Sequence, residues 1–99
     1  MKMEAKEIID FLMERTKNEY SYHIEMCRQE EDLRDKKIGG YELFDVRREK
    51  QISGTRAWAL EGVLFHILND NGQKEEISKY LAWTVECWQN SKCTCPYRC

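Results

Sequence analysis

The sequence predicts an all-α protein in which a long N-terminal helix packs against an antiparallel helical hairpin, followed by an irregular cysteine-rich tail. The 99 residues include one Pro and five Gly, so few positions interrupt a helix. Hydrophobic residues make up 41% and charged residues 34% of the chain, a balance typical of amphipathic helices. We therefore predict a helical domain over residues 1–89 and a tail over residues 90–99.

The first predicted helix covers residues 3–36, a stretch that contains no Pro or Gly and is rich in strong helix formers. Its apolar residues recur at alternating spacings of three and four, as in helices that pack side by side. The seam is expected to consist of Ala5, Ile8, Leu12, Glu19, Tyr22, Met26 and Leu33. Gly39 and Gly40 are expected to end the helix.

Two local questions stay open before the central segment. Residues 41–46 are too few for periodicity to separate a strand from the start of a helix, and we favour a loop or a short helix. Ser53 either caps a helix that restarts at Gly54 or lies within one continuous helix.

Residues 52–69 have the most concentrated apolar pattern and predict a central helix. One broad stripe consists of Ala57, Leu60, Val63, Leu64, Ile67 and Leu68. A second, narrower stripe consists of Gly54, Trp58, Gly62 and Phe65. A helix that is apolar on two sides is either enclosed within a bundle or covered by another chain.

The second stripe is the candidate interface. Gly54 and Gly62 would let another backbone approach closely, while Trp58 and Phe65 are side chains that supply large contact areas at interface centres. The alternative is that the first helix covers this stripe within one monomer. We expect a homo-oligomer, a complex with another protein, or both.

The third predicted helix covers residues 73–89 and follows a turn at Asn71 and Gly72, which makes it an antiparallel neighbour of the central helix. Its inward stripe is predicted to be Ile77, Tyr80, Leu81, Thr84, Val85 and Trp88, with Trp83 and Cys87 beside it.

Four of the five cysteines lie near the C-terminus, and a structural zinc site is one interpretation of them. A closed tetrahedral set of thiolates is what structural zinc prefers. The candidate ligands are Cys87, Cys93, Cys95 and Cys99. Free thiols and a tail that forms disulfides stay open as well, because the spacing departs from paired C-x-x-C knuckles.

A basic and aromatic cluster is the candidate site for a nucleotide or a nucleic acid. Arginine binds phosphate with a bidentate fork, and an aromatic face offers stacking. The cluster consists of Arg47, Arg48, Lys50 and Arg56 with Tyr41 and Phe44. The alternative is a solvated helix start, because Glu42, Asp45 and Glu49 are interspersed and the net charge of the chain is −2.

No set of residues in the sequence predicts catalysis, so we expect a protein that acts by binding and is not an enzyme. His23 and Cys27 are four residues apart and could meet on one helix face, but such a pair is more typical of an inert core. His66 has the same interpretation. The glycines lack the sequence context of a phosphate-binding loop.

The sequence contains no apolar run near the ~20 residues that a membrane span needs. The N-terminus lacks the apolar segment of a secretion signal. We therefore expect a cytoplasmic protein with no membrane contact.

The central helix also supports a resemblance. Its pattern is Ile52-Ser53-Gly54-x-x-Ala57-x-Ala59-Leu60-Glu61-x-Val63-Leu64-x-x-Ile67-Leu68. This pattern, after a long charged helix, resembles small helical proteins encoded by bacteriophages and other mobile elements, over about the middle third of the chain. The resemblance implies a phage-encoded protein that acts in the cytoplasm of a bacterial host. There it would bind and disable a host immune protein such as a CRISPR effector, or sequester a signalling nucleotide. The alternative function is a zinc-stapled module that binds a nucleotide or a nucleic acid.

Overall fold

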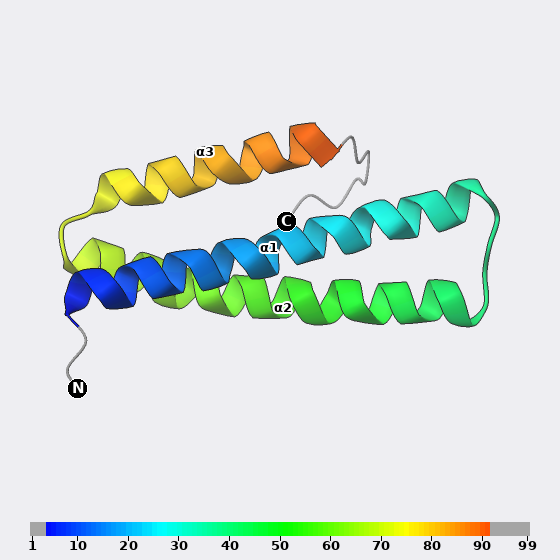
Figure 1. Cartoon of the computed structure of the whole chain (residues 1–99), viewed down its shortest axis with the longest axis horizontal. Coiled ribbons are helices and arrows are strands. Elements are labelled where there is room, and N and C mark those ends of the chain that lie inside the picture. Colours follow the sequence, from blue (N-terminus) through cyan, green and yellow to red (C-terminus); the bar gives the residue numbers. More distant parts are fainter. Residues whose placement is uncertain (1–3, 92–99) are drawn as a thin grey trace.

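The structure, a computed structural model, describes residues 4–91. It contains three helices, α1 (Ala5–Asp35), α2 (Tyr41–Asp70) and α3 (Lys74–Ser91), and this part of the chain has no strand. The predicted all-α class is confirmed (Figure 1). The Cα atoms span 49 × 28 × 15 Å, so the molecule is long and flat. Most of the predicted cysteine-rich tail lies outside the described residues.

The residue that ends α1 in the left-handed conformation is a lysine, which the sequence gives no reason to expect there. Lys37 has a positive φ of 57°, and its N–H donates to the Arg34 carbonyl at 3.0 Å. The Ile38 N–H donates to the Leu33 carbonyl at 2.8 Å, which completes a Schellman motif. The prediction that the glycine pair ends the helix is therefore wrong: Gly40, with a φ of 73°, precedes α2 instead.

The turn between α2 and α3 follows the prediction. Gly72 has a φ of 70° and its N–H donates to the Asn69 carbonyl at 3.1 Å. The Gln73 N–H donates to the Leu68 carbonyl at 2.8 Å, so the same motif ends α2 with glycine in the left-handed position.

α2 is one continuous helix of 30 residues, which answers both open questions. Residues 41–46 are its first turns, so the favoured loop or short helix is wrong: the Phe44 N–H donates to the Gly40 carbonyl at 3.0 Å and the helix continues without a break. Ser53 lies inside the helix, where its hydroxyl donates to the Lys50 carbonyl at 3.0 Å.

α1 and α2 run antiparallel and pack through residues that recur every three or four positions, as in a coiled coil. The buried positions include Ile9, Thr16, Tyr20, His23, Cys27 and Glu30 in α1, and Ser53, Ala57, Leu64 and Leu68 in α2. The predicted seam of α1 is right in part: Met26 is buried and Leu12 packs against the core, but Ile8 and Tyr22 are exposed, so the main line of contact lies one position further along.

The register differs because the true seam contains polar side chains that have partners within the protein. The Thr16 hydroxyl donates to the Leu12 carbonyl at 2.6 Å, and the His23 ring bonds to α2. A polar residue with such a partner is buried at little cost, so counting apolar residues alone selects the wrong face.

α3 packs against both other helices over about half of their length. Tyr80 joins a cluster with Ile9, Leu64 and Leu68, and Trp88 joins a second cluster with Tyr20, Ile24, Cys27 and Ala57. Tyr80, Thr84 and Trp88 of the predicted inward stripe are buried. Leu81 and Val85 of the same stripe are exposed, so that part of the prediction is wrong.

Beyond the end of α3, the α1–α2 hairpin continues without a third helix beside it among residues 4–91 (Figure 1). We call residues 28–50 the arm, and the remaining described residues the three-helix bundle. Glu30 is the only residue of the arm that is buried. Among residues 4–91, no helix combines the length and the apolar character needed to cross a membrane.

Candidate functional site

The most distinctive exposed feature is a surface on α2. A hollow of about 400 Å³ is lined by Trp58, Ala59, Glu61, Gly62, Val63 and Phe65, which we call the Trp58 surface. The Trp58 side chain is 77% exposed. A methyl group added to Gly62 would meet nothing within 4 Å, so the helix backbone is also accessible here. The surface therefore offers a large aromatic ring beside open space.

The Trp58 surface is supported by the core beneath it. The Phe65 ring lies 5.5 Å from the Tyr80 ring in an edge-to-face arrangement. Tyr80 is buried and belongs to the cluster that joins all three helices. Because the backbone of α2 is already held in place here, binding at this surface requires little ordering of the backbone, which favours affinity.

Two exposed apolar residues lie on α3. Lys17 of α1 lies 5.1 Å from the centre of the Trp83 ring, so the Trp83 flank of α3 faces α1. Leu81 and Val85 lie on the opposite flank, about 160° around the helix axis, and are exposed.

The structure places the four predicted interface residues in two environments. Trp58, Gly62 and Phe65 line the Trp58 surface. Gly54 instead packs against the imidazole of His23 on α1: a methyl group there would lie 2.9 Å from the ring carbon Cε1. The role of Gly54 is thus close packing of two helices of the same chain.

Glu61 is a site residue that the sequence interpretation did not assign. It borders the Trp58 surface and also a smaller hollow of about 70 Å³, lined by Tyr20, His23, Gly54, Ala57, Trp58 and Glu61. A signal exists in the sequence, because the residues three and four positions from Glu61 are Ala57, Trp58, Leu64 and Phe65. None of them can neutralise a carboxylate.

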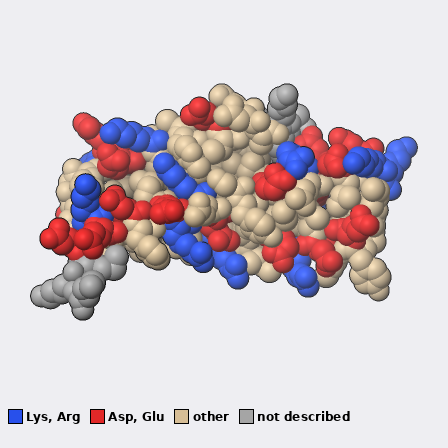
Figure 2. Space-filling model, in the orientation of Figure 1, with Lys and Arg blue, Asp and Glu red and all other residues tan. Residues whose placement is uncertain are grey.

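The predicted basic cluster is balanced by acidic side chains. Arg47 and Lys50 both pair with Glu30 at 3.4 Å. Arg48 pairs with Asp45 at 3.6 Å, and Arg56 lies 4.0 Å from Glu19 on α1. On the face drawn in Figure 2, basic and acidic side chains of the described residues intermingle. Each predicted cation thus has a carboxylate partner that a phosphate would have to displace.

The two aromatic residues predicted for the same site lie near the end of the arm. The side chains of Tyr41 and Phe44 are 88% and 62% exposed. They belong to the first turns of α2, in a part of the chain that α3 does not cover. Binding of a nucleotide or nucleic acid at this cluster stays a prediction.

His23 and Cys27 meet, as their spacing predicts, but inside the protein. Cys27 Sγ lies 3.7 Å from His23 Nε2, and both side chains are buried. His23 Nδ1 lies 2.9 Å from the Lys50 carbonyl oxygen, so we assign the N–H to Nδ1 and the acceptor to Nε2. The Cys27 thiol is enclosed in this structure, and the pair acts in helix packing.

Burial lowers the pKa of His23, and the charge of Lys50 lowers it further, while the hydrogen bond to the Lys50 carbonyl acts in the opposite direction. The neutral imidazole is therefore the form that fits the seam. His66 is different: it lies on the surface of α2, 3.3 Å from Asp70 one turn later.

Of the four predicted zinc ligands, Cys87 lies on α3 and the other three lie outside the described residues. The Cys87 thiol is half-buried beside the cluster that contains Trp88, and burial raises its pKa. Within residues 4–91, no three His, Cys, Asp or Glu side chains are grouped to hold a metal ion. The zinc site stays a prediction.

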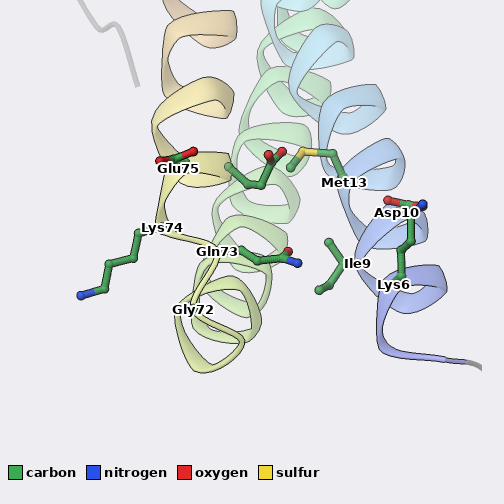
Figure 3. Close-up of a pocket in the computed structure, with 9 residues that line it drawn as sticks. Lys6, Ile9, Asp10, Met13, Gly72, Gln73, Lys74 and Glu75 are labelled. Atoms are coloured by element: carbon green, nitrogen blue, oxygen red, sulfur yellow. The ribbon is translucent and has the colours of Figure 1, made fainter.

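A further cavity, of about 650 Å³, lies between the start of α1 and the turn that leads into α3 (Figure 3). Ile9, Met13 and Gln73 face the space, while Lys74 points away. Both signs of charge line it, from Lys6 and Asp10 to Glu75, Glu76 and Lys74. This mixture favours no particular class of ligand.

Comparison of the chain with protein-family models, with curated proteins and with solved structures gives no match.

Proposed function

We propose that this protein acts by binding another protein through the Trp58 surface. The observation that carries the proposal is the Trp58 indole, 77% exposed beside a hollow of about 400 Å³ on a helix supported by the core. Tryptophan is enriched among the residues that dominate binding energy, especially where it meets a pocket at the centre of an interface.

A protein partner suits this surface better than a small molecule does. Small-molecule sites are concave and enclose most of their ligand. The Trp58 surface lies on the outside of one helix and is open to solvent. Such an open surface is suited to a helix or a loop of another protein.

The class of partner that we propose comes from the bacteriophage resemblance of the central helix. That resemblance favours a protein of a bacterial immune system, for example a CRISPR effector, whose activity would be blocked when its own functional surface is covered.

The test is capture of partners from a bacterial lysate with three forms of the tagged protein: wild type, Trp58→Ala and Tyr41→Ala. Tyr41 is a matched control because it is an exposed aromatic residue of the same helix, outside the Trp58 surface. Wild type and Tyr41→Ala should retain the same protein, and Trp58→Ala should lose it, because removing a hot-spot side chain costs about 2 kcal/mol or more. Equal retention by all three forms would contradict the proposal.

Self-association is a separate possibility for the same surface. A native mass spectrum of protein purified without chelator, compared with its denatured mass, reports both the number of chains and any bound zinc. A multimer that dissociates on Trp58→Ala substitution would assign the surface to a second copy of the chain. A monomer leaves it open for a different protein.

A further inference from the structure

Glu61 differs from two other carboxylates that the fold removes from water, Glu19 and Glu30, in having no cation beside it. Glu30 pairs with Arg34, Arg47 and Lys50, and Glu19 lies 4.0 Å from Arg56. Glu61 is half-buried, and among residues 4–91 no Lys or Arg forms an ion pair with it. Removing a carboxylate from water without a cation to neutralise it is costly, so this position requires an explanation.

The surroundings of Glu61 leave its charge uncompensated. Burial raises the pKa of the Glu61 carboxyl, and its side-chain interaction with the Tyr80 phenol lowers it. Burial, followed by the charge of Glu61, raises the pKa of that phenol in turn. The phenol carries no positive charge, so it interacts with the carboxylate without neutralising it.

Trp58 and Glu61 border both hollows on this side of α2. The larger, of about 400 Å³, is open and apolar apart from Glu61, and the smaller, of about 70 Å³, reaches inward to Tyr20 and His23. An indole face attracts a cation within about 6 Å of its centre, and a carboxylate adds a charge-assisted hydrogen bond. Together the two side chains provide the two interactions that hold an ammonium or guanidinium group.

We propose that the larger of these two hollows, the one on the Trp58 surface, receives a protonated Lys or Arg side chain of the partner protein between Trp58 and Glu61. This inference rests on the proposed function and adds the chemistry that the partner must present: a basic side chain flanked by apolar residues that cover Trp58, Gly62 and Val63. A cation supplied by the partner would neutralise Glu61 only in the complex, which links recognition to the release of an unfavourable charge in the free protein.

The basic side chain fits this site better than a metal ion or an anion does. A metal ion requires several oxygen, nitrogen or sulfur ligands, and Glu61 is the only carboxylate that lines the two hollows. An anion would meet the Glu61 carboxylate directly and be repelled.

The first experiment titrates the whole protein with N-acetyl-lysine N′-methylamide and follows the Trp58 indole N–H resonance by nuclear magnetic resonance. The norleucine analogue, which has an equally long apolar side chain without the ammonium, controls for hydrophobic contact. The lysine probe should shift the resonance with an affinity about ten-fold higher than the norleucine probe, the effect of one modest ionic contact. Equal shifts from both probes would overturn the proposal.

The variant that tests the role of the carboxylate is Glu61→Gln, with Glu75→Gln as the matched control at an exposed carboxylate of α3. Glu61→Gln should abolish the preference for lysine, and Glu75→Gln should keep it. The urea midpoint of Glu61→Gln should equal or exceed that of wild type, because the amide is cheaper to bury than an unpaired carboxylate. A lower midpoint would assign Glu61 to the stability of the fold and overturn the proposal.

Capture from lysate separates this inference from the proposed function. If Glu61→Gln retains the partner fully while Trp58→Ala loses it, the Trp58 surface binds protein, but the proposal that a basic side chain of the partner pairs with Glu61 is refuted. If Trp58→Ala retains the partner, the proposed function itself fails.

Discussion

The three-helix bundle and the arm are built from the same two long helices but are filled in different ways. In the bundle, Leu64 and Leu68 are fully enclosed, and Tyr80 from α3 covers them. In the arm, the single buried residue is Glu30, and its carboxylate is surrounded by Arg34, Arg47 and Lys50. The difference follows the position of α3, which reaches only the bundle.

The comparison shows how much a third helix changes what two helices can bury. A pair of helices has one line of contact, so most of each surface stays in water. A third helix over that line encloses side chains on all sides, and the apolar area removed from water rises. The arm depends on ion pairs, which contribute little where water screens them. We therefore expect most of the stability to reside in the bundle.

The largest change in the free energy of unfolding is expected when a leucine in each region is shortened to alanine. Leu64→Ala should destabilise the protein by about 2 to 5 kcal/mol, because a fully buried leucine loses both its transfer energy and its packing. Leu33→Ala, at a half-buried position of the arm, should cost about 1 kcal/mol or less. Urea unfolding followed by circular dichroism measures both. Equal losses would mean that the arm is as tightly packed as the bundle.

A smaller effect is expected from two glycines of α2. Gly54→Ala should destabilise the protein by about 1 to 2 kcal/mol, because the new methyl group would press on His23, which is held by the Lys50 carbonyl. Gly62→Ala should stabilise it by up to about 1 kcal/mol, since alanine favours the helix and nothing lies in the way. The same unfolding assay compares the pair, and a stabilising Gly54→Ala would contradict the close contact with His23.

The smallest effect is expected at the centre of the arm. Glu30→Gln should cost roughly 1 kcal/mol at low salt and less at about 1 M salt, because an amide interacts weakly with cations that are themselves half-exposed. Glu30→Met should cost at least as much as Glu30→Gln, because it removes the carboxylate that Arg34, Arg47 and Lys50 share and offers these cations no polar atom. A loss for Glu30→Gln that is independent of salt would show that packing, and not charge, determines the effect.

Much of this fold could be predicted from the sequence because helix propensity and turn chemistry are local. The long stretch without Pro or Gly gives α1, and Gly72 ends α2 where the sequence indicates. Lys37 could not be identified, because its left-handed conformation is imposed by the way that α1 must turn into α2. Nothing in a lysine indicates a positive φ.

The register of α1 and the full candidate site depend on contacts that a sequence does not contain. Thr16, His23 and Glu30 are buried because partners elsewhere in the chain or in the same helix satisfy them. Trp58 and Gly62 lie on one side of α2, as helical spacing predicts. That this side is left open by the other described helices depends on how the helices pack, which the sequence does not show. Glu61 could not be assigned to the site from the sequence, because only the folded structure shows that no Lys or Arg of another helix lies beside it.

The two regions also compete as binding surfaces, because each has exposed aromatic residues on α2. The most direct test is hydroxyl-radical footprinting of the complex with the captured partner, in which oxidation of Trp58 is compared with that of Tyr41 and Phe44. Our account predicts that the partner protects Trp58 and leaves Tyr41 and Phe44 as reactive as in the free protein. Protection of Tyr41 and Phe44 with Trp58 still fully reactive would place the interface on the arm and contradict it.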